Sequence, residues 1–278
     1  DYQDIEYLND DGMKEVTGSE TYFGGSYDKG EAHCHPLNYA LGIAKAALSA
    51  NAKIYENSTV SGYELSNSHV KVNTKAGSVK AQRVVLACNG YLGNLERRLN
   101  SKILPMNNYI VATKPLDNET VAKINPRDIA FADSRFIINY FRLSADKRLL
   151  FGGGENYSQE LSNNIIPIVT KPLEKIYPFL RGVKIDYAWG GKLAITMNRL
   201  PFFKEMNKGK VLSAQGYSGQ GVALASYAGK VITEKITGDG EIFDTMANIP
   251  MQSFPGGRFL RNPTMKVGMF YHALLDRL

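Results

Sequence analysis

A short strand, a glycine-rich loop and a helix follow one another in the last third of the chain, and this order constrains the fold more than any other feature. Residues 210–214 predict a short buried strand, and residues 222–236 predict a helix rich in small side chains. Glycines at positions 216, 219 and 221 lie between them. A helix N-terminus reached through glycines offers unpaired N–H groups and a partial positive charge, which favours an anionic group of a ligand. A tight turn without a ligand fits the same spacing.

The first third of the chain carries further α/β signals. Pro36 suits the first position of a helix, apolar residues follow it at helical spacing, and Asn51 ends the helix. Residues 53–60 predict the next strand. Residues 70–81 alternate between apolar and polar side chains around a glycine, which predicts a β-hairpin. Residues 83–88 are a continuous apolar run, typical of a strand buried on both faces of a parallel sheet.

The middle of the chain has a different character. β-Branched and aromatic residues at 104–116, 136–140 and 149–151 predict strands, the last two paired as an antiparallel hairpin. Residues 166–178 predict a helix that contains proline, and residues 183–197 predict a long strand. The expected fold class is therefore α/β plus antiparallel β, with an antiparallel sheet built onto an α/β unit.

Composition limits the class of protein further. Of 278 residues, 44% are hydrophobic and 22% are charged, which fits a globular protein with a sizeable core. No apolar run is long enough to cross a bilayer. The net charge of +6 comes from scattered basic residues, which does not indicate a nucleic-acid surface. Two cysteines are too few for a disulfide framework, so we expect a reducing, cytoplasmic location.

Five stretches of the chain follow one another in an order that is specific as a set, although each is modest alone. They are HCHPLNYAL at 33–41, VVLACNG at 84–90, LLFGGG at 149–154, YAWGG at 187–191 and GYSGQG at 216–221. Together they resemble the D-amino-acid-oxidase superfamily of FAD-dependent oxidoreductases, most closely its gamma-glutamylputrescine oxidoreductase type. The resemblance implies an enzyme that transfers hydride from a C–N carbon of an amine or amino acid to FAD, giving an imine that hydrolyses.

The resemblance also implies where FAD binds. Val60 is expected beside the adenine, with its backbone as the contact. The residues expected near the ribose and pyrophosphate are Ala87, Cys88, Asn89 and Gly90. The residues expected to face the flavin ring are Gly216, Tyr217, Ser218, Gly219, Gln220 and Gly221. The N–H groups of this loop and the helix dipole would stabilise the negative charge that reduction places on the ring.

By the same resemblance, the chain alternates between two domains, an incomplete Rossmann-like FAD-binding domain and an antiparallel-sheet substrate domain. The expected FAD-binding segments are 28–98 and 206–245. The expected substrate-domain segments are 1–27 and 99–205, and residues 246–278 form a C-terminal tail.

One motif of the family is missing from the expected place. Family members begin with a strand, a Gly-x-Gly-x-x-Gly loop and a helix that hold the pyrophosphate, and no such motif precedes residue 21. We therefore expect this chain to need an N-terminal half, or to associate with itself through the apolar surface left uncovered. The alternatives are a non-catalytic remnant or partner subunit, and an unrelated α+β binding module whose glycine loop is structural.

The substrate is constrained only weakly. Many members that take α-amino acids carry an arginine on the strand before the final proline turn, where it clamps a carboxylate. Leu193 occupies the aligned position, which favours a small-molecule amine such as an N-acylated diamine. Tyr140, Arg142 and Trp189 are candidates for the substrate face. The alternative roles are cross-strand packing for the two aromatic residues and a solvated charge for Arg142. We nominate no catalytic residue, because the chemistry needs a positioned, unprotonated amine more than a strong base.

Other polar residues carry weaker signals. His33 and His35 alternate around Cys34, but a zinc site needs further ligands, so a polar turn fits better and we expect no metal. Cys88 ends a buried strand, where a thiol is usually inert. Residues 267–275 are amphipathic, and we expect them to cover the protein's own core rather than a membrane or partner.

Overall fold

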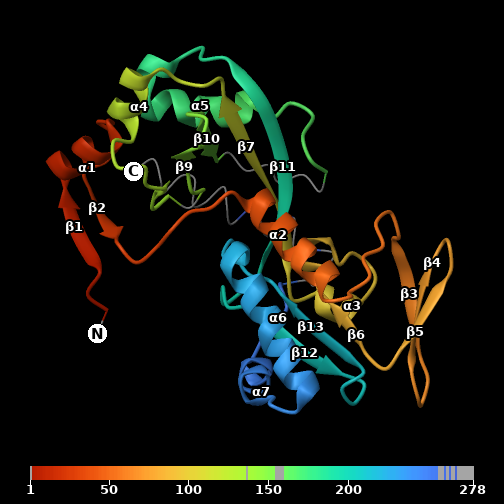
Figure 1. Ribbon diagram of the computed structural model, residues 1–278. Coiled ribbons are helices and arrows are strands. Elements are labelled where there is room, and N and C mark those ends of the chain that lie inside the picture. Colours follow the sequence, from red (N-terminus) through yellow and green to blue (C-terminus); the bar gives the residue numbers. More distant parts are fainter. Residues whose placement is uncertain are drawn as a thin grey trace. The chain divides into compact units, whose positions relative to one another are not determined.

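The computed structural model describes residues 2–135, 137–153 and 160–255, together with residues 260, 263 and 267. Two compact units alternate along the chain (Figure 1). Within the described residues, the first unit contains the chain up to Ala40 and Asn107–Gly191. The second contains Leu41–Met106 and the chain from Lys192 onward. The cofactor and substrate roles of the segments expected from the sequence stay predictions.

The first unit begins with a two-stranded antiparallel sheet whose strands are connected by a helix. Its elements are β1 (Ile5–Asn9), α1 (Asp10–Thr17) and β2 (Gly24–Asp28). Asn9 caps the helix, because its side chain accepts a hydrogen bond from the N–H of Gly12 at 3.0 Å. Sequence patterning did not predict β1 or α1, because the polar opening of the chain shows no clear period. Strand β2 exists through its antiparallel pairing with β1.

A five-stranded sheet forms the body of the first unit, in the order β11-β7-β10-β9-β8. The strands are β7 (Leu104–Thr113), β8 (Phe131–Ala132), β9 (Tyr140–Leu143), β10 (Leu149–Gly152) and β11 (Ile185–Ile195). Residues 104–106 of β7 and residues 192–195 of β11 belong to the second unit. The predicted hairpin is present as β9 and β10, but its first strand begins at Tyr140, later than expected. The turn decides this register, since the N–H of Ser144 donates to the carbonyl of Arg148 at 2.9 Å. Phe136 lies outside the described residues.

Two helices and a short 3-10 turn complete the first unit: α4 (Asn118–Ile124), α5 (Ile166–Ile176) and η2 (Pro178–Leu180). Helix α5 confirms the proline-containing helix predicted over 166–178. Helix α4 was not predicted. Asp117 caps its N-terminus, because the Asp117 carboxylate accepts a hydrogen bond from the N–H of Thr120 at 2.8 Å.

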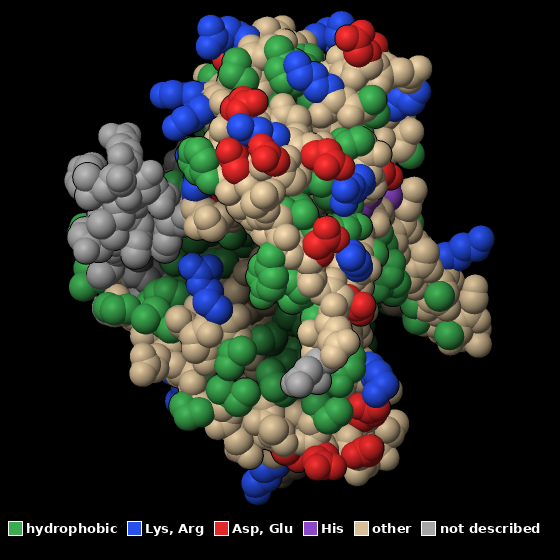
Figure 2. All heavy atoms as spheres, turned by 90° about the vertical axis from the view of Figure 1, so that its left-hand side faces the viewer, with side chains coloured by type: hydrophobic (Ala, Val, Ile, Leu, Met, Phe, Trp, Pro, Cys, Tyr) green, Lys and Arg blue, Asp and Glu red, His purple; other side chains and the backbone are tan. Residues whose placement is uncertain are grey.

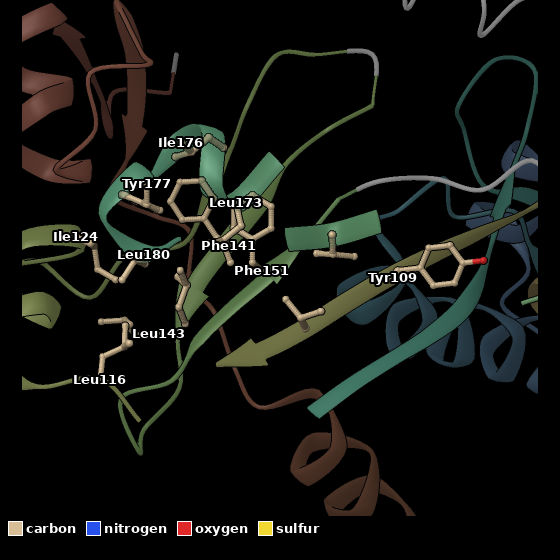
Figure 3. Close-up of a cluster of buried hydrophobic side chains, with 13 residues drawn as sticks. Tyr109, Leu116, Ile124, Phe141, Leu143, Phe151, Leu173, Ile176, Tyr177 and Leu180 are labelled. Carbon is tan, nitrogen blue, oxygen red and sulfur yellow. The ribbon is translucent and has the colours of Figure 1, made fainter. Parts of the chain in front are cut away.

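The core of the first unit packs α5 against one face of the sheet (Figure 3). Phe141 stacks on Phe151 with ring centroids 5.4 Å apart, and the edge of Tyr177 meets it at 5.6 Å. Because side chains alternate along a strand, Tyr140 and Arg142 lie on the opposite face of β9. The buried cluster comprises Tyr109, Val111, Leu116, Ile124, Phe141, Leu143, Leu149, Phe151, Val169, Leu173, Ile176, Tyr177 and Leu180.

An ion pair at the edge of this sheet should make the first unit sensitive to acid. Arg148 donates to Asp186 Oδ2 at 2.6 Å and to the carbonyl of Thr113 at 2.9 Å, and Lys184 lies 3.0 Å from the same carboxylate. Arg148 and then Lys184 hold the pKa of Asp186 below its usual value. A carboxylate whose pKa is lower in the folded than in the unfolded protein stabilises the fold at pH values above its unfolded pKa of about 3.9. This contribution to the free energy of unfolding is lost as pH falls through the folded pKa.

We therefore expect Asp186→Asn to lower the stability of the first unit at neutral pH and to make its stability fall less steeply below about pH 4. Urea unfolding at several pH values measures both effects. Fluorescence of Trp189, the single tryptophan of the sequence, reports on the first unit, because Trp189 lies on β11. If the stability of the variant fell as steeply below about pH 4 as that of the unmodified chain, Asp186 would not be the source of the acid sensitivity.

The second unit contains a three-stranded sheet in the order β12-β13-β6. Strands β6 (Val84–Leu86) and β13 (Val211–Gln215) are parallel, and β12 (Phe202–Met206) is antiparallel to β13. The strands predicted at 83–88 and 210–214 are thereby confirmed. Burial on both faces is confirmed for β13 but not for β6, where Val85 is 39% exposed. The described residues place no strand on the outer edge of β6.

Helix α6 (Gly221–Thr237) follows β13 and packs with α7 (Glu241–Asn248) through a cluster that includes Phe203 and Phe243. Gly238, at φ +118°, ends α6 in the left-handed conformation that helix C-termini favour. The predicted helix over 222–236 is confirmed. Its position directly after β13 places its N-terminus at the carboxyl end of that strand.

The remaining elements of the second unit are short: β3 (Val60–Leu65), β4 (Val70–Thr74), β5 (Ser78–Ala81), η1 (Asn89–Tyr91) and α3 (Arg97–Asn100). The hairpin predicted over 70–81 is confirmed as β4 and β5. The strand predicted over 53–60 is wrong, since only Val60 belongs to a strand. Ile54 and Tyr55 are 48% and 68% exposed, and a strand requires a ladder partner that the described residues do not provide.

Helix α2 (Pro36–Ser49) confirms the helix predicted from Pro36, yet it buries none of its residues. Leu37, Leu41 and Leu48 are 61%, 58% and 53% exposed. Figure 2 shows hydrophobic side chains, in green, on the molecular face that it presents. A helix that exposes several large apolar side chains, as α2 does, commonly marks a contact with another polypeptide. Among the described residues, no helix has the length and apolar character needed to cross a membrane.

Candidate functional site

The parallel strands β6 and β13 end at the same edge of their sheet, and the chain segments that follow them are joined. The N–H of Gly216, after β13, donates to Asn89 Oδ1, after β6, at 3.0 Å. Both residues have positive φ, +75° for Gly216 and +45° for Asn89. Ligands of open α/β sheets bind at the carboxyl ends of such strands. The structure therefore brings together two segments that the sequence predicted to bind a cofactor.

The end of β11 anchors the other side of the glycine loop. The N–H of Ser218 donates to the carbonyl of Ala194 at 2.9 Å, and the N–H of Thr196 donates to Ser218 Oγ at 3.3 Å. A methyl group on Gly216 would lie 2.5 Å from Thr196 Cγ2, so only glycine fits. Sequence reasoning missed Ala194 and Thr196. Their only sequence signal is that they end a predicted strand.

The N–H groups of the loop alternate between those with protein acceptors and those without. The engaged groups belong to Gly216, Ser218 and Gln220. Among the described residues, those of Gly219 and Gly221 meet no acceptor. Helix α6 begins at Gly221, so its partial positive charge adds to these donors. The loop thus fits the electron-rich edge of a ring or an anionic group.

The other residues predicted to bind the cofactor have different surroundings. Val60 begins β3 in the separate β3-β4-β5 sheet and is 37% exposed. Ala87 is exposed, whereas Gly90 is buried, and a Cβ there would lie 3.0 Å from the carbonyl of Lys192. Burial raises the pKa of the half-buried Cys88, which keeps it a neutral thiol. Their roles at the cofactor stay predictions.

Gln215 is a polar residue at this edge that sequence reasoning missed. It is the last residue of β13, it is fully buried, and neither atom of its amide has a hydrogen-bond partner among the described residues. A buried amide without a partner costs about 1–3 kcal/mol. A glutamine at the end of a mostly apolar strand is the signal that could have drawn attention to it.

Tyr140 is held rigidly on the open face of the first unit's sheet. Its hydroxyl donates to Asn108 Oδ1 on β7, which lies beyond β10 in the sheet. The ring crosses Gly152 on β10, where a methyl group would overlap it. Glycine at position 152 therefore allows an aromatic ring to lie flat across the neighbouring strand.

Arg142 shares the face of Tyr140, but its guanidinium is already partly engaged. It donates to the carbonyl of Leu143 at 3.0 Å and to the carbonyl of Cys34 at 2.8 Å. Trp189 lies on β11, and β7 and β10 separate it from β9. The structure thus brings Tyr140 and Arg142 together and leaves Trp189 apart. Contact of these three residues with a substrate stays a prediction.

The histidines near α2 make ordinary polar contacts. His33 Nε2 lies 2.8 Å from the carbonyl of Asp128, and His35 Nδ1 accepts from the N–H of Asn38 at 3.3 Å. In the part of the chain that the structure describes, no group of three His, Cys, Asp or Glu residues is placed to hold a metal ion.

A glycine loop between the carboxyl end of a parallel strand and a helix N-terminus is the place where open α/β proteins bind nucleotide-type cofactors. The chain belongs to the FAD dependent oxidoreductase family, whose model matches residues 1–235. This membership confirms the superfamily and the cofactor, FAD, that the sequence predicted.

Two curated relatives are similar over nearly the whole chain. It is 36% identical over 275 residues to the gamma-glutamylputrescine oxidoreductase of Escherichia coli. It is 35% identical over 280 residues to the probable oxidoreductase OrdL of Haemophilus influenzae. Each match covers 99% of this chain but 64% of the relative, so the chain spans less than two thirds of their length.

The fold is also that of a solved glycine oxidase. The crystal structure of glycine oxidase from Bacillus cereus matches with a TM-score of 0.73 and 19% identity, over 89% of this chain and 69% of that one. Identity at this level shows the fold alone. It supports the predicted combination of α/β and antiparallel β structure.

Proposed function

We propose that the chain provides the flavin-ring and substrate parts of an FAD-dependent oxidoreductase that oxidises a C–N bond of an amine. The observation that carries this proposal is the anchored glycine loop, which leaves the N–H groups of Gly219 and Gly221 without protein acceptors. The 36% identity to gamma-glutamylputrescine oxidoreductase supports an N-acylated diamine as the substrate class.

FAD, when bound, supplies the acceptor for hydride from the carbon next to the amine nitrogen. The N–H groups of Gly219 and Gly221 and the N-terminus of α6 would hold the electron-rich edge of the ring. These donors are fixed before reaction, because Asn89 and Ala194 anchor the loop. Fixed donors stabilise developing negative charge without the cost of reorganisation.

Residues of the chain also favour an amine over a free α-amino acid. Leu193 precedes Ala194 on β11, and an aliphatic side chain there offers no bidentate partner to a carboxylate. Tyr140 offers a flat aromatic ring on the open face of its sheet, and Arg142 offers the remaining donors of its guanidinium. These groups position a substrate rather than act as a strong base.

The phosphates of FAD would need donors other than this loop. The 278 residues contain no Gly-x-Gly-x-x-Gly sequence, the motif that places a pyrophosphate at a helix N-terminus. Both curated relatives are longer than this chain, and α2 leaves its apolar side chains in water. We propose that a further polypeptide segment, outside these 278 residues, covers α2 and holds the phosphates.

This proposal predicts that the chain alone binds riboflavin, and binds FAD only modestly more tightly, because the ring-binding loop is present and the motif that places the pyrophosphate at a helix N-terminus is not. Fluorescence titration with each flavin gives the two dissociation constants. Much tighter binding of FAD would refute the proposal for the phosphates, and no binding of either flavin would refute the flavin-ring site. Anaerobic addition of an N-acylated diamine to the flavin-loaded protein should then bleach the visible flavin band. Bleaching by glycine but not by the diamine would overturn the substrate class.

A further inference from the structure

The side chain of Asn89 is directed at the glycine loop. Its Oδ1 accepts the N–H of Gly216 at 3.0 Å, and this bond links the segments that follow the two parallel strands. Asn89 has φ +45°, a left-handed conformation that asparagine tolerates better than most residues. The backbone is therefore held in an unusual shape that aims the side-chain amide at the loop.

The loop has two anchors, and the N–H groups of Gly219 and Gly221 lie beyond them. The first anchor is the bond from Gly216 to Asn89, and the second is the 2.9 Å bond from Ser218 to Ala194. Gly219 and Gly221 follow the second anchor, and a Cβ at Gly219 would meet no atom within 4 Å. Because the chain between the anchors is so short, the direction of the following N–H groups depends on both.

We infer that Asn89 is a positioning residue for the flavin-binding loop, acting through the N–H of Gly216. This inference rests on the proposed function, since the loop is proposed to hold the flavin ring. A neutral amide suits the role. A carboxylate at position 89 would offer the same acceptor but would bring negative charge to a site that has to stabilise negative charge.

Three variants separate positioning from charge. Asn89→Gly deletes the acceptor while tolerating the positive φ, and Asn89→Asp keeps an acceptor and adds a charge. Asn57→Gly is the matched control, because Asn57 has φ +53° and is exposed. The measurements are amide hydrogen exchange at Gly216 by NMR, riboflavin affinity, and the midpoint potential of bound riboflavin.

In Asn89→Gly, we expect exchange at Gly216 to become about fivefold faster, as for the loss of one net hydrogen bond. Riboflavin affinity should fall with it. Asn89→Asp should keep slow exchange but lower the midpoint potential, because the reduced ring carries more negative charge. Asn57→Gly should match the unmodified chain in all three measurements.

Two results would overturn the inference. Unchanged exchange at Gly216 in Asn89→Gly would show that the bond does not anchor the loop. Faster exchange with unchanged riboflavin affinity would show that the anchor does not serve the flavin. If the unmodified chain binds no riboflavin, the proposed function fails and the role toward flavin falls with it, whereas faster exchange in Asn89→Gly would still establish the anchor.

Discussion

Replacing Gly216 by alanine should abolish riboflavin binding and destabilise the second unit by about 2–5 kcal/mol. Gly216 has φ +75°, a conformation that costs an L-residue about 1–2 kcal/mol. The new methyl group would lie 2.5 Å from Thr196 Cγ2 and 3.3 Å from Ile103 Cγ2. Both neighbours are buried, so overpacking adds about 1–3 kcal/mol. Relief of this overlap would displace the loop that carries the ring-binding donors.

Gly221→Ala is the matched control for this experiment. A Cβ at Gly221 meets nothing closer than 3.6 Å, an ordinary contact with Tyr217, and its backbone needs no positive φ. We expect the control to keep its stability within about 0.5 kcal/mol. Denaturant unfolding followed by circular dichroism compares the two variants. Equal losses in both would show that contact with Thr196 does not account for the effect.

Replacing Phe141 by alanine should destabilise the first unit by about 3–5 kcal/mol, the cost of deleting a large buried aromatic side chain. Phe141 is 3% exposed and contacts aromatic rings on several sides. It stacks on Phe151, meets the edge of Tyr177, and lies 4.9 Å from the ring of Phe131. A rigid sheet and a packed helix surround it, so the cavity cannot close fully.

Trp189 fluorescence follows this change selectively, because the tryptophan lies on β11 of the same sheet. The control is Phe179→Ala, whose side chain is 46% exposed and has Lys123 Nζ 4.0 Å from its ring centroid. Its loss should cost less than the loss of Phe141, since little buried area, one exposed cation–π contact and one edge contact with Tyr177 disappear. Similar costs for both variants would show that the cluster around Phe141 is not the core of the first unit.

The elements that the sequence predicted well are those whose signals are local. Helices α2, α5 and α6 follow from apolar spacing, from proline near the start and from glycine at the end. The hairpin β4–β5 follows from strict alternation around Gly77, whose carbonyl accepts the N–H of Thr74 at 2.8 Å. In each case the hydrogen bonds join residues close in sequence, so a short window contains the information.

The elements that the sequence missed or misplaced depend on partners far away along the chain. Residues 53–59 have strand-like composition but no ladder partner among the described residues, whereas the unpredicted β1 exists by pairing with β2. The start of β9 depends on its turn and on its pairing with β10. Propensity cannot decide such cases, because a strand is stabilised by neighbours rather than by its own residues.

The amino-acid sequence by itself determined the family, the cofactor, and the strand, glycine loop and helix that make up the central feature of the site. Only the tertiary structure decided which groups of that loop are available to a ligand. Asn89 and Ala194 lie far from the loop in sequence, and they take up alternate N–H groups and leave those of Gly219 and Gly221. Hydrogen bonds between distant segments leave no periodic pattern in the sequence, because each is set by the positions of two strands and not by local spacing.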